Sequence, residues 1–234
     1  MLILSIDIGM KNLAHCLLQQ QETTMQIIDW GIVDLTDAPK CHMCVKSASY
    51  RMAHGTYCKK HVPVLPKLQG LLKPELETLC ATHGLPIGAR SEMAASLAAY
   101  KKKDVIKQCT TVEIGRALAA TYARFPRVDV VLVENQMAAK MAVVQGMVIQ
   151  YWVMREAPVI EVVSPANKLK GLLNGKTTYA QRKKFSVAHT REILITQNLP
   201  TIEFDAHKKK DDLADTFLQA LWYLQTVKNT KKTN

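Results

Sequence analysis

Four carboxylates stand where an acidic side chain is a poor choice for packing. Asp7 closes the apolar segment LILSID, and Glu134 closes the apolar segment VDVVLVE. Asp212 and Asp215 lie in KKKDDLADTF near the carboxyl end, three residues apart and therefore on one face of a helix. Like charges this close are destabilising unless a cation or basic group neutralises them. The pattern predicts a Mg²⁺ site, because this ion prefers carboxylate oxygens.

Such a site would favour hydrolysis of a phosphodiester. Two Mg²⁺ ions roughly 4 Å apart can activate a water and stabilise the leaving oxygen, and Mn²⁺ is an alternative ion. Each acid could also have a purely structural role. Asp7 before a glycine turn could be a turn residue, and Glu134 could cap a helix or pair with a lysine. Asp212 and Asp215 could be first-turn helix acids, the role in which we leave Asp211.

A second cluster has the spacing of a metal site. The pattern C-x2-C-x13-C-x2-H is formed by Cys41, Cys44, Cys58 and His61. Two ligand pairs separated by a loop are typical of tetrahedral structural zinc, and four filled positions leave none for a substrate. His42 or His54 could replace His61 as the fourth ligand. We expect zinc to fold a short insertion that lacks a core of its own.

The chain is basic, with a formal net charge of +11, which favours a polyanionic partner. A basic surface kept for solubility is the alternative. From Lys168 to the end there are 13 Lys and Arg against 6 Asp and Glu, whereas residues 1–35 hold one Lys and no Arg. This unequal distribution favours a phosphate-binding surface. The candidate DNA-binding residues, each of which could equally be a solvated charge, are Lys11, Arg182, Lys183, Lys184, Lys209 and Lys210.

The elements that must position these residues follow from hydrophobic patterning. Strands near residues 2–8, 13–19 and 25–33 form an antiparallel meander, and later strands fall at 128–133 and in PVIEVV. Helices are expected near residues 111–124, 138–155, 180–197 and 210–226. Strands followed by alternating helices and strands predict an α/β fold with a mixed sheet.

The composition divides the chain. Residues 1–35 and 111–234 carry the core pattern, residues 36–65 form the zinc-binding insertion, and residues 66–110 form a helical insertion. Two short helices around a Gly-Leu-Pro turn resemble a SAP-type nucleic-acid-binding hairpin. Helices that simply pack together are the alternative.

Membrane and secreted classes are excluded by the sequence. No run approaches the ~18 to 20 apolar residues of a membrane helix. The amino terminus has a strand pattern without the regions of a signal peptide. We expect a protein that is not secreted, has no membrane partner, and lies in the cytoplasm or nucleus, or in the host cytoplasm if it is viral.

Three segments resemble the acidic motifs of the RuvC-like Holliday junction resolvases of the RNase H-like superfamily: SIDIGMKNLAHCLL, VLVENQ and KKKDDLADTFLQAL. The poxviral and mitochondrial branches are the most similar. The family's basic cluster before the last motif is matched by QRKKFSVAHT. The resemblance covers the chain except about residues 36–110, the insertion.

The resemblance implies an RNase H-like five-stranded sheet of order 3-2-1-4-5, flanked by helices, in which the strands that carry Asp7 and Glu134 are neighbours. It implies that Asp7, Glu134, Asp212 and Asp215 hold two Mg²⁺. It also implies a catalytic lysine near the scissile phosphate, for which we choose Lys184, with Lys183 one register away.

The resemblance further implies a homodimer that cuts four-way DNA junctions symmetrically in recombination and repair. The candidate interface is the Met- and Val-rich segment after Glu134, and burial in the monomer core is the alternative for its members Met137, Met141, Val144 and Val148.

The expected function is therefore a structure-selective, metal-dependent endodeoxyribonuclease. A flap or RNA–DNA hybrid nuclease and a non-catalytic zinc-containing nucleic-acid-binding protein are the alternatives. A kinase or ATPase of the actin-like fold fits poorly, since the chain has room for one lobe and shows no second phosphate-binding glycine loop.

Overall fold

A computed structural model describes residues 1–22, 24–107, 109–172 and 177–232, with the side chains of residues 227–232 left aside. The chain forms two compact units. The first comprises Met1–Thr36 and Thr110–Asn234, and the second comprises Asp37–Cys109. None of the helices in the described part of the chain combines the length and apolar composition that a membrane span needs.

The first unit is built on a five-stranded sheet of order β3-β2-β1-β7-β8. Its strands are β1 (Leu2–Asp7), β2 (Leu13–Gln21), β3 (Thr24–Val33), β7 (Val130–Glu134) and β8 (Val159–Val163). The first three pair antiparallel, whereas β7 lies parallel to β1 and β8 lies parallel to β7. Since β7 and β8 are the fourth and fifth strands of this unit, the predicted mixed sheet of order 3-2-1-4-5 is confirmed.

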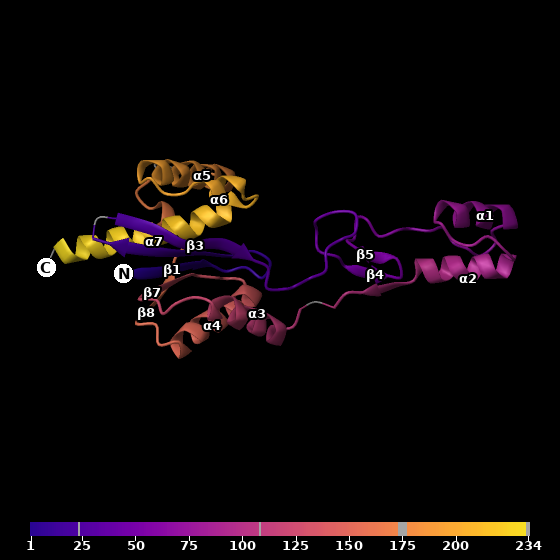
Figure 1. The fold of residues 1–234 in the computed structure, drawn as a ribbon, viewed down its shortest axis with the longest axis horizontal. Coiled ribbons are helices and arrows are strands. Elements are labelled where there is room, and N and C mark those ends of the chain that lie inside the picture. Colours follow the sequence, from indigo (N-terminus) through magenta and orange to yellow (C-terminus); the bar gives the residue numbers. More distant parts are fainter. Residues whose placement is uncertain (23, 108, 173–176, 233–234) are drawn as a thin grey trace. The chain divides into compact units, whose positions relative to one another are not determined.

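Helices cover both faces of this sheet (Figure 1). On one side lie α3 (Thr111–Ala123) and α4 (Ala139–Met154). On the other lie α5 (Tyr179–Thr196), the short α6 (Ile202–Ala206) and α7 (Lys210–Lys232). A 3-10 turn, η1 (Asn167–Leu169), packs against α7. The long helices begin within two residues of their predicted positions, whereas α6 is too short for the sequence pattern to show it.

The helix α7 is fixed to the sheet by polar contacts within an apolar core. Gln219 donates a hydrogen bond from Nε2 to the Ser5 hydroxyl of β1, over 3.1 Å. Trp30 of β3 donates from its indole nitrogen to the Leu213 carbonyl of α7, and its ring stacks on Phe204 of α6. These contacts set the position of α7 along the strands, and therefore the position of its acidic residues.

The second unit joins a small sheet to a helical hairpin. The sheet has the order β5-β4-β6, with strands β4 (Tyr50–Met52), β5 (Gly55–Tyr57) and β6 (Lys103–Val105). The helices α1 (Lys73–Thr82) and α2 (Arg90–Lys101) pack around a core of their own: Leu65, Leu76, Cys80, Met93 and Leu97. Both predicted insertions lie in this unit, and β6, which follows α2, pairs with β4 of the cysteine-rich part. Strands of three residues are too short for hydrophobic alternation to reveal them.

Candidate active site and metal centres

Three of the four predicted acids meet at the carboxyl end of the central strands. Asp7 ends β1 and Glu134 ends β7, and the pairing of Ile6 with Val133 makes the two carboxylates neighbours. Asp215 reaches them from α7, so that one carboxylate oxygen from each residue lies within 4.8 Å of the others. Asp212, one helical turn earlier, is outside this group; it lies near Lys183 and Lys209.

The cluster is an unfavourable place for negative charge. Burial and the neighbouring Glu134 raise the pKa of Asp7 to about 8. Burial also raises the pKa of Asp215, and burial together with Asp211 raises the pKa of Asp212. Carboxyl groups that resist ionisation side by side are the groups that a divalent cation would neutralise, and their oxygens are ligands that Mg²⁺ prefers. The donor set therefore fits this ion.

A lysine that the sequence analysis missed lies between two of these acids. Lys168 of η1 places its Nζ 2.9 Å from Glu134 Oε2 and 2.6 Å from Asp215 Oδ2. Burial lowers the pKa of this ammonium, but Asp215 and Glu134 raise it by more, so it stays charged. No sequence signal could have singled it out, since it stands in a polar loop without periodicity.

The structure places the two neighbouring lysines of α5 differently, with Lys183, and not the chosen Lys184, beside the acids of α7. Lys183 contacts Asp211 and lies 3.8 Å from Asp212, whereas Lys184 is exposed. The reason is helical phase: Lys183 shares the inward face with the buried Ser186 and Thr190, and Lys184 is turned away by one position. Asp211 lies in the first turn of α7, as predicted, and is also the partner of Lys183, which lowers the pKa of Asp211 against the effect of burial.

The other predicted DNA-binding residues lie in the first unit, and most of them are exposed. Lys11 and Arg182 are exposed, and Arg182 donates a hydrogen bond to the Thr177 carbonyl. Lys209 is exposed and lies 3.9 Å from Asp212, and Lys210 is half-buried at the start of α7.

Gly9, two residues after Asp7, is required for a steric reason. A Cβ at Gly9 would lie 2.4 Å from the backbone oxygen of Asn12, so the turn from β1 to β2 excludes any side chain there. This tight turn leads the chain away from the end of β1 and leaves the Asp7 carboxylate beside the neighbouring strand.

The four predicted zinc ligands also come together. Ligand atoms of Cys41, Cys44, Cys58 and His61 all lie within 4.8 Å of one another. Cys41 Sγ is 3.7 Å from His61 Nδ1, and Cys44 Sγ is 3.9 Å from Cys58 Sγ. Burial opposes ionisation of Cys41, but backbone hydrogen bonds from Cys58 and Met43 lower the pKa of its thiol to about 6. Three thiolates and one imidazole nitrogen fit tetrahedral zinc.

Neither alternative histidine belongs to this cluster. His54 stacks on Tyr100 of α2, with ring centroids 3.9 Å apart, and His42 is exposed beside Tyr57. The geometry thus favours His61 as the fourth ligand.

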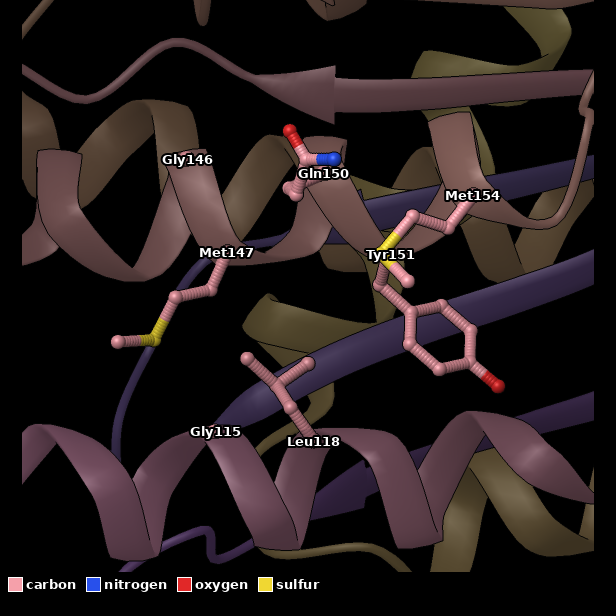
Figure 2. A pocket seen from close by; sticks show the side chains of 7 residues that line it. All are labelled: Gly115, Leu118, Gly146, Met147, Gln150, Tyr151 and Met154. Carbon is pink, nitrogen blue, oxygen red and sulfur yellow. The ribbon is translucent and has the colours of Figure 1, made fainter.

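A pocket on the first unit lies apart from the acids, between α3 and α4 (Figure 2). Its lining includes Gly115 of α3 and Gly146 of α4, and a Cβ at either glycine would have no atom within 4 Å. Figure 2 shows the side chains of Leu118 and Met147 in the space between the two helices. No acid of the cluster lines this pocket, so we assign it no part in the chemistry.

Two family models match the chain over more than half of its length. The model described as "Poxvirus A22 protein" matches residues 89–228, and "Mitochondrial resolvase Ydc2 / RNA splicing MRS1" matches residues 3–155. No curated protein sequence matches the chain.

Solved structures with a similar fold include the fowlpox virus Holliday junction resolvase, with 16% identity and a TM-score of 0.51 over 97% of this chain and 99% of that one. The yeast mitochondrial Holliday junction resolvase Ydc2 has 16% identity and a TM-score of 0.48, over 94% of this chain and 78% of that one. A fowlpox virus resolvase in complex with substrate Holliday junction DNA also has 16% identity and a TM-score of 0.48, over 97% and 99%.

Proposed function

This chain belongs to the protein families described as Poxvirus A22 protein and Mitochondrial resolvase Ydc2 / RNA splicing MRS1, and from that membership we propose that it is an endonuclease that resolves four-way DNA junctions. The observation that supports this most directly is the meeting of Asp7, Glu134 and Asp215 from two strands and a helix. The similarity to the fowlpox virus resolvase extends to the whole fold.

The acidic cluster would hold two divalent cations, Mg²⁺ or Mn²⁺. Asp7, Glu134 and Asp215 are the ligands, with Asp212 on the adjacent turn of α7 as the fourth. When bound, the cations supply an activated water and stabilise the leaving oxygen of the phosphodiester.

The lysines would bind the negatively charged phosphates of the DNA backbone. Lys168 pairs with Glu134 and Asp215, and with metal bound its ammonium would be available to contact a phosphate of the DNA. Lys183, held by Asp211, presents a second positive charge beside Asp212. Arg182, Lys184, Lys209 and Lys11 would contact the DNA backbone farther from the cleaved bond.

The decisive experiment compares Asp7→Asn with the wild type on matched junction, flap, duplex and RNA–DNA hybrid substrates, with Mg²⁺ and with EDTA. We expect the wild type to cut the junction in preference to the others, and only with metal. Asp7→Asn should lower the cleavage rate by at least about a hundredfold, because it removes a metal ligand, while junction binding persists.

The matched control is Glu161→Gln, which removes an exposed carboxylate from the neighbouring strand β8 and should cut normally. Normal cleavage by Asp7→Asn would refute the catalytic assignment. A preference of the wild type for flaps or hybrids would refute the junction as its substrate.

Two further parts of the proposal concern assembly. The Cys41, Cys44, Cys58 and His61 cluster would bind one structural Zn²⁺ that folds the second unit. The protein would act as a homodimer, which fits a substrate with two-fold character. Val144 and Val148 are buried in the monomer, so a second copy would instead dock on the groove between α3 and α4, beside the exposed Val153 and Met154.

A further inference from the structure

The second unit carries most of the net positive charge of the chain. Residues 37–109 contain twelve Lys and Arg against five Asp and Glu, a net charge of +7 out of +11. The acidic cluster lies in the first unit, so this charge has no part in holding the metal ions proposed above. A surplus of this size in 73 residues requires its own explanation.

Four of these basic residues form a basic strip at the end of α2 and along β6. The strip comprises Lys101, Lys102, Lys103 and Lys107, all of which are exposed. Among the described residues, none of the four has a carboxylate within ion-pair distance, although Lys73 of the same unit pairs with Glu77. Lys101 instead donates to the Pro66 carbonyl, and Lys103 lies over the ring of Tyr50. The positive charge of the strip therefore remains available to a partner.

The fold presents this strip at the edge of a sheet. The strand β6 leaves the end of α2 and pairs antiparallel with β4, which sets Met52 opposite Lys103 and Arg51 opposite Asp104, so Lys103 and Arg51 lie on opposite faces of the sheet. The Ile106 nitrogen donates to the Ser49 carbonyl, so the pairing continues to the residue before Lys107. Since β6 is the outer strand of this sheet, one of its edges has no neighbouring strand.

The cysteine cluster and the helical hairpin hold this strip in place. His54, in the turn between β4 and β5, stacks on Tyr100 near the end of α2, with the rings 3° from parallel. Cys58, four residues after His54, follows β5 directly and is a member of the cysteine cluster. The strip is thus supported from both sides.

We propose that the basic strip binds the phosphate backbone of the duplex arms of the branched DNA. The proposal rests on the function proposed above and adds a second contact surface outside the active site. Exposed Lys and Arg without acidic partners suit phosphates, which are contacted irrespective of base sequence. The duplex arm is the part of a junction that offers phosphates away from the branch point.

The test measures junction binding by the full chain in an Asp7→Asn background, so that no cleavage interferes. One variant carries Lys102→Glu, Lys103→Glu and Lys107→Glu, and its matched control carries Arg at the same three positions. Each is titrated with junctions whose arms are about two helical turns or about half a turn long. Thermal unfolding and zinc content establish that both variants are folded.

On long arms, the Glu variant should bind at least about tenfold more weakly, and its plot of log affinity against log salt should be less steep by about 2 to 3, because each lost phosphate contact removes about 0.9 from the slope. The Arg variant should bind like its parent. On short arms all three proteins should bind alike.

Equal affinities on long arms would overturn the proposal, as would an equal loss on long and short arms. Failure of the proposed function is a separate outcome. A chain with native Asp7 that cuts no junction would refute the nuclease, whereas the dependence of binding on arm length would still decide the role of the strip.

Discussion

At the scale of single residues, the candidate active site places several half-buried carboxyl groups around one ammonium. Lys168 contacts Glu134 and Asp215 but not Asp7, and Asp7 is the group whose pKa rises to about 8. In the metal-free protein Asp7 therefore holds a proton at neutral pH, and a binding cation must displace it.

This proton makes Mg²⁺ affinity depend on pH. Binding requires ionised Asp7, so the affinity should fall about tenfold per pH unit as the pH drops below about 8, with one proton released per binding event. Calorimetry in buffers of different ionisation enthalpy measures both quantities. A flat affinity between pH 6 and 8 would contradict the assignment.

The same shift predicts the stability of the metal-free protein. The native state keeps the Asp7 proton up to a pH of about 8, whereas the unfolded chain loses it near its ordinary pKa of 3.8. Because the native state binds more protons between these values, stability should decrease as the pH rises through this window. Urea unfolding at different pH values measures this dependence of stability on pH. Asp7→Asn should abolish it.

Sequence reasoning was effective for residues that break a strong pattern. Asp7 and Glu134 each end an apolar strand, which made them visible, and the two-residue spacing did the same for the cysteines. Lys168 interrupts no pattern, and its role follows only from the position of η1 beside α7. The choice between Lys183 and Lys184 depended on the helical phase of α5, which the sequence left uncertain by one residue.

At the scale of elements, α7 must sit in one register against β1 for Asp215 to reach Asp7. Ser5 and Asp7 point to the same face of β1, and Asp215 and Gln219 are one turn apart on α7. The buried hydrogen bond between Ser5 and Gln219 therefore holds two acids in position. These are Asp7, two residues after Ser5 in β1, and Asp215, four residues before Gln219 in α7.

Gln219→Leu should lower the unfolding free energy by about 1 to 3 kcal/mol, since it leaves the Ser5 hydroxyl buried without its partner. It should also lower kcat more than junction affinity, because it disturbs the acids and not the DNA surface. Urea unfolding and single-turnover cleavage measure the two effects. Adding Ser5→Ala should restore much of the stability, and a double-mutant cycle without such coupling would refute the role.

The cysteine cluster should determine whether the second unit folds. Cys58→Ser removes one thiolate, so the protein should lose its one equivalent of zinc and the second unit should become sensitive to proteolysis. Cys80→Ala is the matched control, since this buried cysteine belongs to the core between α1 and α2 and not to the cluster. Zinc retained at full occupancy by Cys58→Ser would contradict the assignment.

Long elements were predictable and short ones were not. The helices α3, α4 and α5 span several turns, so their apolar periodicity locates them closely. The strands β4, β5 and β6 have three residues each, and α6 has five, which is too few for either period to be distinguished. The pairing of β6 with β4 was unpredictable for the same reason, and with it the union of the zinc-binding and helical parts.

At the scale of the whole molecule, the chain divides its tasks between a unit that carries the acids and a unit that carries most of the positive charge. The sequence predicts the boundary between the units, because the change of composition at Thr36 lies next to the observed boundary. It does not predict which unit carries more positive charge, since the basic segment from Lys168 onwards belongs to the first unit. The contacts between two copies of the chain are beyond sequence patterns, since an apolar residue in α4 can face the core or a partner.

The groove between α3 and α4 offers a test of the proposed homodimer. Gly146→Ala should stabilise the fold by up to about 1 kcal/mol and leave the dimer intact, because its Cβ meets no atom within 4 Å. Gly146→Arg places a long charged side chain in the groove and should give a monomer in analytical ultracentrifugation. A dimer that persists in Gly146→Arg would place the interface elsewhere.

The backbone hydrogen bonds between the two ends of the second unit affect how such a protein can change during evolution. The Pro39 carbonyl accepts a backbone hydrogen bond from Ala48, and the Ser49 carbonyl accepts one from Ile106. These bonds connect the backbone near the beginning of the unit to the backbone near its end. A segment closed in this way can be gained or lost at a surface loop without stretching the host sheet. Residues 37–109 could thus be inserted as one segment between β3 and α3 of a homologous protein, or deleted from that position.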